Sequence, residues 1–413
     1  MRVVVLTEQR FLRGPDGRVW VNHTCTSRFW RNYLLAFDRV RVVARVLAVE
    51  KVPRGYSHAD GDRIEFHDVP SYQGPAAFLQ RYASVRAAVL SGVEDDDAVI
   101  LRLGSQLANV LFPKLLQDGH PYAVEVVGDP WEVFAPGVVA HPLRPFFRCW
   151  FYWTLRLQCL HANAAAYVTK YSLQRRYPVG PATPTTNYSS VDLDFACPAR
   201  VSVSTSDVVI EDALLDGSLR VVPVDGPWHL VLVGSLEQPY KGVDVALQAL
   251  SQMLARSIPV HLVVVGDGQL RKNLEAQAQA LGVAHAVTFR GSLPREEVLN
   301  ELRRSDLFLI PSRTEGLPRA LIEAMAVGVP AIGSHVGGIP ELLEPEEMVP
   351  PGEVTALAKL ISVVLGDPAR RSKMSERNRT KAMEFRESVL RDQRAAYYRH
   401  VRQLTENWTR SRK

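Results

Sequence analysis

The sequence has little of several features that would each point to a particular class of protein. Cysteine is scarce, and the four cysteines lie far apart without a C-x-x-C pair: Cys25, Cys149, Cys159 and Cys197. This spacing argues against a disulfide framework and against a zinc site. No apolar run reaches the roughly 18 residues of a membrane-spanning helix, and the segment MRVVVLTEQR becomes charged too early for a signal peptide. We therefore expect a cytoplasmic protein with reduced thiols.

Strong charge of one sign is also lacking. The net charge is +5 and the basic residues are spread along the chain, which suits an anionic ligand or an anionic membrane surface and does not indicate nucleic acid. No G-x-G-x-x-G follows the first strand expected in either half, so a dinucleotide-dependent dehydrogenase fits poorly. The chain has 413 residues, of which 46% are hydrophobic, and this is enough for two globular domains.

The second half of the chain alternates short apolar runs with amphipathic segments. Five runs have the length and composition of strands: WHLVLVGS, VHLVVVGDG, AVTFRGS, LFLIPS and PAIGS. The segments between them have helical periodicity. This alternation predicts an α/β domain with a parallel sheet covered by helices, and ligands of such sheets bind at the carboxyl ends of the strands.

The loop PSRTEGLP leads from one of these strands into an alanine-rich helix. Pro318 fits the first helical turn because its missing N–H would be unpaired there in any case. We expect the N–H groups of Arg319 and Ala320, with Gly316 and Leu317 just before them, to face a ligand. A helix start of this kind favours an anion, especially phosphate.

Neighbouring loops carry further residues that fit a nucleotide diphosphate. Lys241, at the head of a helix, is placed to meet phosphate oxygens, and Gly266 and Gly268 allow a ligand close to the backbone. Glu323 can accept hydrogen bonds from two vicinal hydroxyls, as a carboxylate does at ribose, and Glu315 lies one loop nearer the reacting end.

Each acid also has a simpler interpretation. Glu323 could form a solvated pair with Arg319 at i, i+4, and Glu315 could be a first-turn acid favoured by the helix dipole. The lysine and the Gly-Asp-Gly turn are weak signals by themselves. Their combination, in this order and on these loops, favours the nucleotide site.

The segment PSRTEGLPRALIEAMAVGVPAIGS resembles the E-x7-E signature of the retaining glycosyltransferases of family 4 (glycosyl transferases group 1), with Glu315 and Glu323 at the required spacing. The resemblance covers residues 228–345 and is much weaker over 1–200. It implies the α/β architecture called GT-B, in which two Rossmann-like domains face each other across a cleft. Residues 1–200 would bind the acceptor, residues 222–387 would bind the nucleotide-sugar donor, and a helix at about 388–413 would cross back to the first domain.

The same resemblance implies residue roles. Glu323 would bond the ribose hydroxyls, Glu315 would contact the donor sugar and Lys241 would contact the diphosphate. The backbone near Phe289 and Arg290, with the Gly-Asp-Gly loop, would border the base. A loop of the first domain that contains Gly17 would approach the donor phosphates.

Two departures from the family pattern concern the donor site, the first at the diphosphate and the second at the sugar. Ser235 stands where the family often has an arginine, and we consider Arg13, Arg18 and Arg313 as replacements. The sequence EGLP replaces the commoner EGFG, so Pro318 removes one backbone N–H that could contact the sugar.

A third departure is that the cleft histidine common in the family is absent. Asp129 is our substitute candidate, although a turn or cap before Pro130 also explains it. A retaining transfer of this type generally needs no protein nucleophile, because the departing diphosphate can take the acceptor proton on the same face. The protein would then mainly stabilise the leaving-group charge, through Lys241 and helix-start N–H groups.

Residues 141–160 mix arginines with aromatic residues and predict either a helix at a membrane surface or an ordinary packed helix. We expect a metal-independent retaining hexosyltransferase without a cofactor, using a UDP- or GDP-linked sugar. The expected acceptor is a glycan hydroxyl, possibly polyprenyl-linked, at the inner face of the cell membrane in surface polysaccharide synthesis. A nucleotide-sugar epimerase of the same architecture and a non-catalytic nucleotide-sugar-binding subunit are the alternatives, and nucleic acid is not an expected partner.

Overall fold

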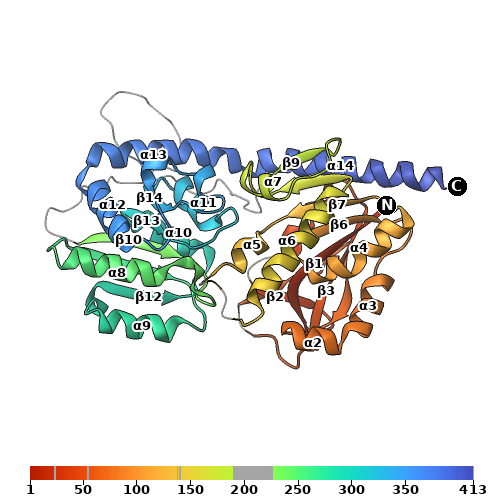
Figure 1. Cartoon of the computed structure of the whole chain (residues 1–413), viewed down its shortest axis with the longest axis horizontal. Coiled ribbons are helices and arrows are strands. Elements are labelled where there is room, and N and C mark those ends of the chain that lie inside the picture. Colours follow the sequence, from red (N-terminus) through yellow and green to blue (C-terminus); the bar gives the residue numbers. More distant parts are fainter. Residues whose placement is uncertain (23–24, 54, 137, 139–140, 189–226, 413) are drawn as a thin grey trace. The chain divides into compact units, whose positions relative to one another are not determined.

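The computed structural model describes residues 1–22, 25–53, 55–136, 138, 141–188 and 227–412. These residues form two compact units (Figure 1). Unit 1 consists of Met1–Pro130, Cys149–Tyr188 and Leu390–Lys413, and unit 2 of Trp131–Arg148 and the described part of Ser189–Val389. The segment Trp131–Arg148 groups with unit 2, and the domain limits 1–200 and 222–387 stay a prediction from sequence. Cys197 and the predicted boundary between residues 200 and 222 lie outside the described residues.

Unit 1 is built on a nine-stranded, mostly parallel sheet. Its parallel strands lie in the order β5-β3-β1-β6-β7-β8-β9, and β2 and β4 extend the sheet by antiparallel pairing beside β1. The strands are β1 (Arg2–Arg13), β2 (Val19–Asn22), β3 (Arg39–Ala48), β4 (Tyr56–His58), β5 (Ile64–Pro70), β6 (Ala98–Leu103), β7 (Tyr122–Val126), β8 (Ala164–Tyr167) and β9 (Thr185–Asn187). Residues 3–6 of β1 are completely buried, as expected for a parallel strand that helices cover on both faces.

The helices of unit 1 pack their apolar side chains onto this sheet. One core joins the sheet to α3, α4 and α6 through residues such as Val85, Leu111 and Leu155. The helices are α1 (Ser27–Trp30), η1 (Tyr33–Leu35), α2 (Gly74–Gln80), α3 (Tyr82–Ser91), α4 (Gln106–Asp118) and α7 (Ser172–Arg176), whereas α5 (Pro130–Val133), α6 (Arg144–Leu160) and the start of α14 (Glu387–Ser411) run across the division between the units.

A buried polar cluster fixes the C-terminal helix α14 to unit 1. Glu125 on β7 accepts hydrogen bonds from the hydroxyls of Tyr33 (2.9 Å), Tyr188 (2.8 Å) and Tyr398 (3.2 Å), the last of which lies on α14. Glu125 also forms an ion pair with Arg102 on β6. Sequence reasoning placed a helix here but gave no sign of this acid, because its partners come from four distant segments.

Unit 2 contains a six-stranded parallel sheet with the order β12-β11-β10-β13-β14-β15. Numbered along the chain, this is the order 3-2-1-4-5-6 of a doubly wound Rossmann sheet. The strands are β10 (Trp228–Val233), β11 (Val260–Val265), β12 (Val287–Gly291), β13 (Leu307–Ile310), β14 (Ala331–Ser334) and β15 (Met348–Val349). The helices are η2 (Pro239–Lys241), α8 (Val243–Leu254), α9 (Arg271–Ala280), η3 (Ala284–Ala286), α10 (Arg295–Arg304), α11 (Arg319–Ala326), η4 (Ile339–Glu341), η5 (Pro345–Glu347), α12 (Val354–Gly366), α13 (Pro368–Ala382) and η6 (Met383–Phe385).

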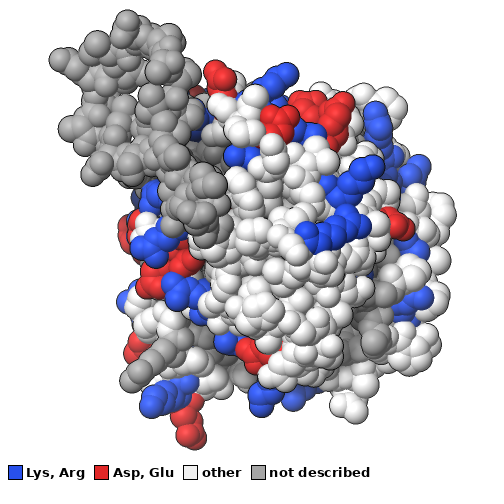
Figure 2. All heavy atoms as spheres, turned by 90° about the vertical axis from the view of Figure 1, so that its left-hand side faces the viewer, with Lys and Arg blue, Asp and Glu red and all other residues white. Residues whose placement is uncertain are grey.

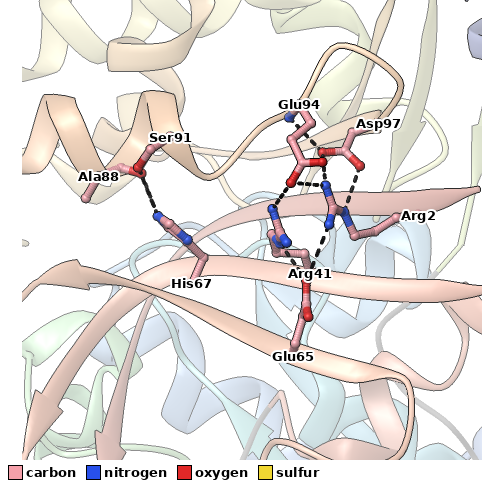
Figure 3. Close-up of polar contacts among 8 residues, drawn as sticks. All are labelled: Arg2, Arg41, Glu65, His67, Ala88, Ser91, Glu94 and Asp97. Carbon is pink, nitrogen blue, oxygen red and sulfur yellow. Dashed lines mark hydrogen bonds and ion pairs between the residues drawn. The ribbon is translucent and has the colours of Figure 1, made fainter.

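Ion pairs tie the amino ends of the unit 1 strands together (Figure 3). Arg2 on β1 pairs with Asp97 (2.8 Å) and Glu94 (2.7 Å), and Arg41 on β3 pairs with Glu65 (2.6 Å) and Glu94 (2.9 Å). These contacts lie opposite the carboxyl ends of the strands, where ligands of such sheets bind. We therefore assign the cluster to stability, to which partly exposed pairs each add little.

Charged groups of both signs occur on the face of the molecule seen in Figure 2, with uncharged surface between them. None of the described helices is both long enough and apolar enough to cross a membrane.

Candidate active site

The strand order of unit 2 places a topological switch point at the carboxyl ends of β10 and β13. These two strands are neighbours, with Leu230 paired to Leu307, yet the chain leaves them toward opposite sides of the sheet. The loop after β10 carries Lys241 and the loop after β13 carries Glu315. Lys241 Nζ donates to Glu315 Oε1 at 2.7 Å. The two residues thus meet at the switch point, where Rossmann sheets bind their ligands.

Glycine contacts hold the lysine in place. Gly242 follows η2 with φ +67°, and a Cβ there would lie 2.0 Å from the carbonyl oxygen of Pro311. Gly234 lies under the lysine side chain, because a Cβ on it would come within 2.8 Å of Lys241 Cε. Burial opposes a charge on Lys241, but the Glu315 carboxylate outweighs burial and the pKa of Lys241 is raised. The ammonium is therefore charged at neutral pH.

Glu315 is held from several sides. Its side chain is 7% exposed, and the fully buried Ser312 donates its hydroxyl to Glu315 Oε1 at 2.7 Å. The loop after β14 packs against the backbone here, because Gly338 N–H donates to the Gly316 carbonyl at 2.8 Å. A Cβ on Gly337, which has φ +53°, would lie 1.8 Å from the Glu315 carbonyl oxygen.

Helix α11 begins beside this pair. Pro318 is its N-cap and Arg319 its first residue. Among the described residues, no backbone carbonyl accepts the N–H groups of Arg319, Ala320 or Leu321, whereas Ile322 N–H bonds the Pro318 carbonyl. These donors form the kind of helix start that favours an anion.

Glu323 lies one turn further along α11. Its side chain is 13% exposed, and the nearest ion-pair partner is Arg295 Nε on α10, 3.8 Å from Glu323 Oε1. Burial raises the pKa of Glu323, and Arg319 and Arg295 oppose that rise. In the described part of the chain, no donor hydrogen-bonds this carboxylate. It is therefore a mostly buried acceptor next to the helix start rather than a solvated surface acid.

The glycines expected to border a base are in close contact with the chain itself. A Cβ on Gly266 would lie 1.8 Å from the Gly234 carbonyl oxygen, and one on Gly268 would lie 2.3 Å from Glu237 N. These glycines thus let the loops after β10 and β11 pack together. Their contact with a nucleotide stays a prediction.

Arginines fix the neighbouring end of β12. Arg271 on α9 donates to the Phe289 carbonyl at 3.1 Å. Arg290 is paired with Glu301 on α10, with Arg290 Nε 3.1 Å from Glu301 Oε1. The side chain of Arg290 therefore faces α10, and the predicted contact with the base would involve the backbone.

The arginines considered from sequence as replacements have acid partners, and their contact with a diphosphate stays a prediction. Ser235 accepts the Glu237 N–H at 3.3 Å within its own turn. Arg13 pairs with Asp68, Arg18 with Asp60 and Arg313 with Asp244. The cations that act on the Glu323 carboxylate of α11 are Arg319 and Arg295. Sequence reasoning missed Arg295, because only the packing of α10 beside α11 brings it to Glu323.

The candidate residues of unit 1 have structural partners. Asp129 is buried, accepts the Tyr177 hydroxyl at 2.6 Å and forms an ion pair with Arg176. Gly17 has φ +77° in the turn between β1 and β2, and its carbonyl accepts a hydrogen bond from Arg13 at 2.6 Å. Contacts of either residue with a donor remain predictions.

At the corresponding position of unit 1, between β1 and β6, lies an acid of the chain itself, Glu8. Glu8 Oε2 accepts the Ser105 hydroxyl at 3.0 Å and the Gln106 N–H at 2.9 Å, at the start of α4. Glu8 Oε1 accepts the Tyr72 hydroxyl at 2.9 Å and pairs with Arg45 at 3.1 Å. A carboxylate thus already occupies the anion position in unit 1, whereas in unit 2 the helix start is open.

Comparison with known proteins agrees with this geometry. The sequence profile of the family described as "Glycosyl transferases group 1" matches residues 221–381, which include Lys241, Glu315 and Glu323. Residues 221–381 therefore form a group 1 glycosyltransferase domain. Among its relatives, Protein CapJ of Staphylococcus aureus is 26% identical over 82% of this chain and 80% of that protein. The amylovoran biosynthesis glycosyltransferase AmsK of Erwinia amylovora is 32% identical over 40% of this chain and 42% of that protein.

Solved structures show that the chain has the GT-B fold. Sucrose-phosphate synthase of Thermosynechococcus elongatus superposes with a TM-score of 0.70 at 18% identity, covering 97% of this chain and 99% of that one. HepE of Anabaena, crystallised with UDP and glucose, gives 0.63 at 18% identity, covering 96% and 98%. The predicted α/β fold class and family are confirmed.

The described residues contain no group of three or more His, Cys, Asp or Glu side chains placed to hold a metal ion.

Proposed function

We propose that this glycosyltransferase moves a hexose from a nucleotide-diphosphate sugar to a glycan hydroxyl with retention of configuration at the anomeric carbon. The observation that carries this proposal is the meeting of Lys241 and Glu315 across the switch point of unit 2, one helical turn from the buried acceptor Glu323. The site presents, in this order, the ammonium of Lys241, the N–H groups at the start of α11 and the Glu323 carboxylate, which accepts no hydrogen bond from the described residues. A diphosphate and a ribose need these groups in that order.

In the proposed complex, Glu323 accepts the ribose hydroxyls, and Lys241 with the N–H groups of Arg319 and Ala320 binds the diphosphate. Glu315 meets the hexose. The bond from the anomeric carbon to the diphosphate oxygen breaks while the acceptor oxygen bonds the same carbon from the same face. The acceptor proton passes to the departing diphosphate oxygen. Lys241 stabilises the charge that develops on that leaving group, and the reaction needs no metal ion.

The donor base is uracil or guanine in this proposal. Support for UDP comes from HepE, a protein of the same fold crystallised with UDP and glucose. We propose a lipid-linked glycan of surface polysaccharide synthesis as the acceptor, because AmsK is an amylovoran biosynthesis glycosyltransferase. Polyprenyl-linked intermediates would place the reaction at the cytoplasmic face of the cell membrane.

Helix α6 supports a peripheral membrane contact. Five large apolar side chains of α6 that are 45–59% exposed follow one another at alternating spacings of four and three residues, which places them along one face of the helix: Phe146, Trp150, Trp153, Leu157 and Leu160. The exposed Leu143 directly precedes the helix. Tryptophan, phenylalanine and leucine on one face are typical of helices that lie in a membrane interface.

The arginines of α6 contribute less to this surface than the sequence suggested. Arg144 donates to the Phe134 carbonyl, Arg148 to the Trp131 carbonyl and Arg156 to the Arg176 carbonyl. The proposed contact thus rests on apolar side chains. Flotation with vesicles of anionic lipid tests it, and the wild type should float, whereas the variant with Phe146, Trp150 and Trp153 changed to serine should not. Leu79→Ser, which removes an exposed leucine elsewhere, should float like the wild type, and equal flotation of all three proteins would refute the proposal.

Transfer itself is tested with UDP-glucose or GDP-mannose and a bacterial lipid-linked glycan extract. We expect nucleotide diphosphate to be released only when acceptor is present, and the product to keep the anomeric configuration of the donor in its NMR spectrum. Epimerised donor without acceptor would favour the epimerase alternative. Donor binding without turnover on any extract would favour a binding subunit.

A further inference from the structure

The Glu315 carboxylate is held through only one of its two oxygens. Ser312 Oγ donates to Oε1 at 2.7 Å, and Lys241 Nζ donates to the same oxygen at 2.7 Å. No donor hydrogen-bonds Oε2 within the part of the chain that the structure describes. One oxygen is therefore anchored, and the other is left to accept a hydrogen bond from a ligand.

The two groups that donate hydrogen bonds to Glu315 Oε1 respond differently when the nucleotide sugar binds. A bound diphosphate strongly attracts the positive charge of Lys241. Once the donor is bound, the ammonium therefore bonds both the diphosphate and Glu315, or leaves Glu315 for the diphosphate. Ser312 is neutral, fully buried and only three residues before Glu315, in the same loop after β13. Its hydroxyl has no competing role at the phosphates.

We propose that Ser312 is a positioning residue for hexose recognition, which keeps the Glu315 carboxylate oriented toward the donor sugar while Lys241 turns to the diphosphate. This inference rests on the proposed function, because it takes the ligand of Glu315 to be the donor hexose. It separates two parts of the donor site: Ser312 serves the sugar, whereas Glu323 and the start of α11 serve the nucleotide.

The alternative is that Ser312 only satisfies a buried carboxylate. A purely structural hydroxyl would affect the whole loop, so its loss would weaken nucleotide and nucleotide-sugar binding alike. A positioning residue for the sugar would weaken only the ligand that carries the sugar. This difference can be measured as a split between two dissociation constants.

The test compares UDP with UDP-glucose, and GDP with GDP-mannose, by isothermal titration of the full chain. For Ser312→Ala we expect the dissociation constant of the nucleotide diphosphate to stay within about twofold of the wild type. The dissociation constant of the matching nucleotide sugar should rise about 5- to 10-fold, the usual size for the loss of one hydrogen bond. Ser312→Thr, which keeps the hydroxyl, should restore most of the sugar affinity.

Two further variants sharpen the comparison. Ser375→Ala removes another buried serine of unit 2, whose hydroxyl donates to the Gly328 carbonyl at 2.6 Å, and it should change neither constant. In a Glu315→Gln background, Ser312→Ala should cost little further sugar affinity, because the carboxylate that it positions is gone. If Ser312→Ala does not fold, Ser312→Cys fills the same space with a weaker donor and should show the same split.

Three results would overturn the inference. Equal weakening of both ligands would make Ser312 structural, and unchanged affinity for both would make it dispensable. A wild type that binds neither nucleotide nor nucleotide sugar would overturn the proposed function together with this inference, so the two failures are distinguishable.

Discussion

Replacing Glu323 with glutamine should stabilise the ligand-free protein. The carboxylate is 13% exposed, and its nearest ion-pair partner, Arg295, is 3.8 Å away. Burial raises the pKa of Glu323 above its ordinary value of 4.5. Between the ordinary and the raised pKa the folded state binds more protons than the unfolded state, so this group lowers stability as pH rises through that window. The penalty is therefore larger at neutral pH than at pH 5.

Glutamine keeps the shape of the side chain and removes the charge. We expect Glu323→Gln to raise the free energy of unfolding at pH 7 by about 1 kcal/mol, as relief of an unfavourable functional group commonly does. For a domain of this size that is roughly 2–4 °C in Tm. Thermal unfolding followed by circular dichroism between pH 5 and pH 8 measures it, and the difference from the wild type should shrink toward pH 5.

Glu376→Gln is the matched control, because Glu376 is an exposed acid of the same unit, and it should leave Tm unchanged. A Glu323→Gln variant that is less stable than the wild type by 1 kcal/mol or more at pH 7 would refute the reasoning. The carboxylate would then be a stabilising partner of Arg295 or Arg319 rather than an acceptor kept open for a ligand.

Three other substitutions should lower stability for separate reasons. Lys241→Met leaves the buried Glu315 carboxylate without its cation and should lower the free energy of unfolding by about 3–5 kcal/mol. Adding Glu315→Gln should recover part of this loss, and urea titration measures both variants. Gly266→Ala places a methyl group 1.8 Å from the Gly234 carbonyl oxygen and should cost about 1–3 kcal/mol; a Tm within 1 °C of the wild type would contradict this close packing. Glu125→Gln leaves Arg102 buried without a carboxylate and should cost about 3 kcal/mol, with faster amide exchange in α14 by mass spectrometry; unchanged protection of α14 would contradict its fixation by Glu125.

The parallel sheet of unit 2 was predictable because each of its strands is a short apolar run and each helix has its own periodicity. The spacing of Glu315 and Glu323, with Lys241 ahead of them, indicated the site because these residues lie in loops at the same edge of the sheet. Local patterns of this kind need no knowledge of distant partners.

What could not be predicted depends on pairs far apart in the sequence. Arg295 reaches Glu323 only because α10 packs beside α11, and Glu8 caps α4 across 98 residues. The burial of Glu125 beneath α14 is of the same kind. For α6, composition suggested a surface of mixed basic and aromatic side chains. The arginines instead donate to backbone carbonyls of the fold, and the sequence alone does not show where those carbonyls lie.

Isothermal titration of UDP, GDP and ADP, each with its common sugar conjugates, tests the placement of the donor site most directly when the wild type and Glu323→Ala are compared. We expect one base to bind the wild type, and we expect the variant to lose at least tenfold in affinity for both the nucleotide and its sugar, because the ribose contact is common to the two ligands. Equal affinity of the variant and the wild type would contradict the assignment of Glu323. The absence of binding by any of these ligands to a well-folded wild type would contradict the donor site in unit 2 altogether.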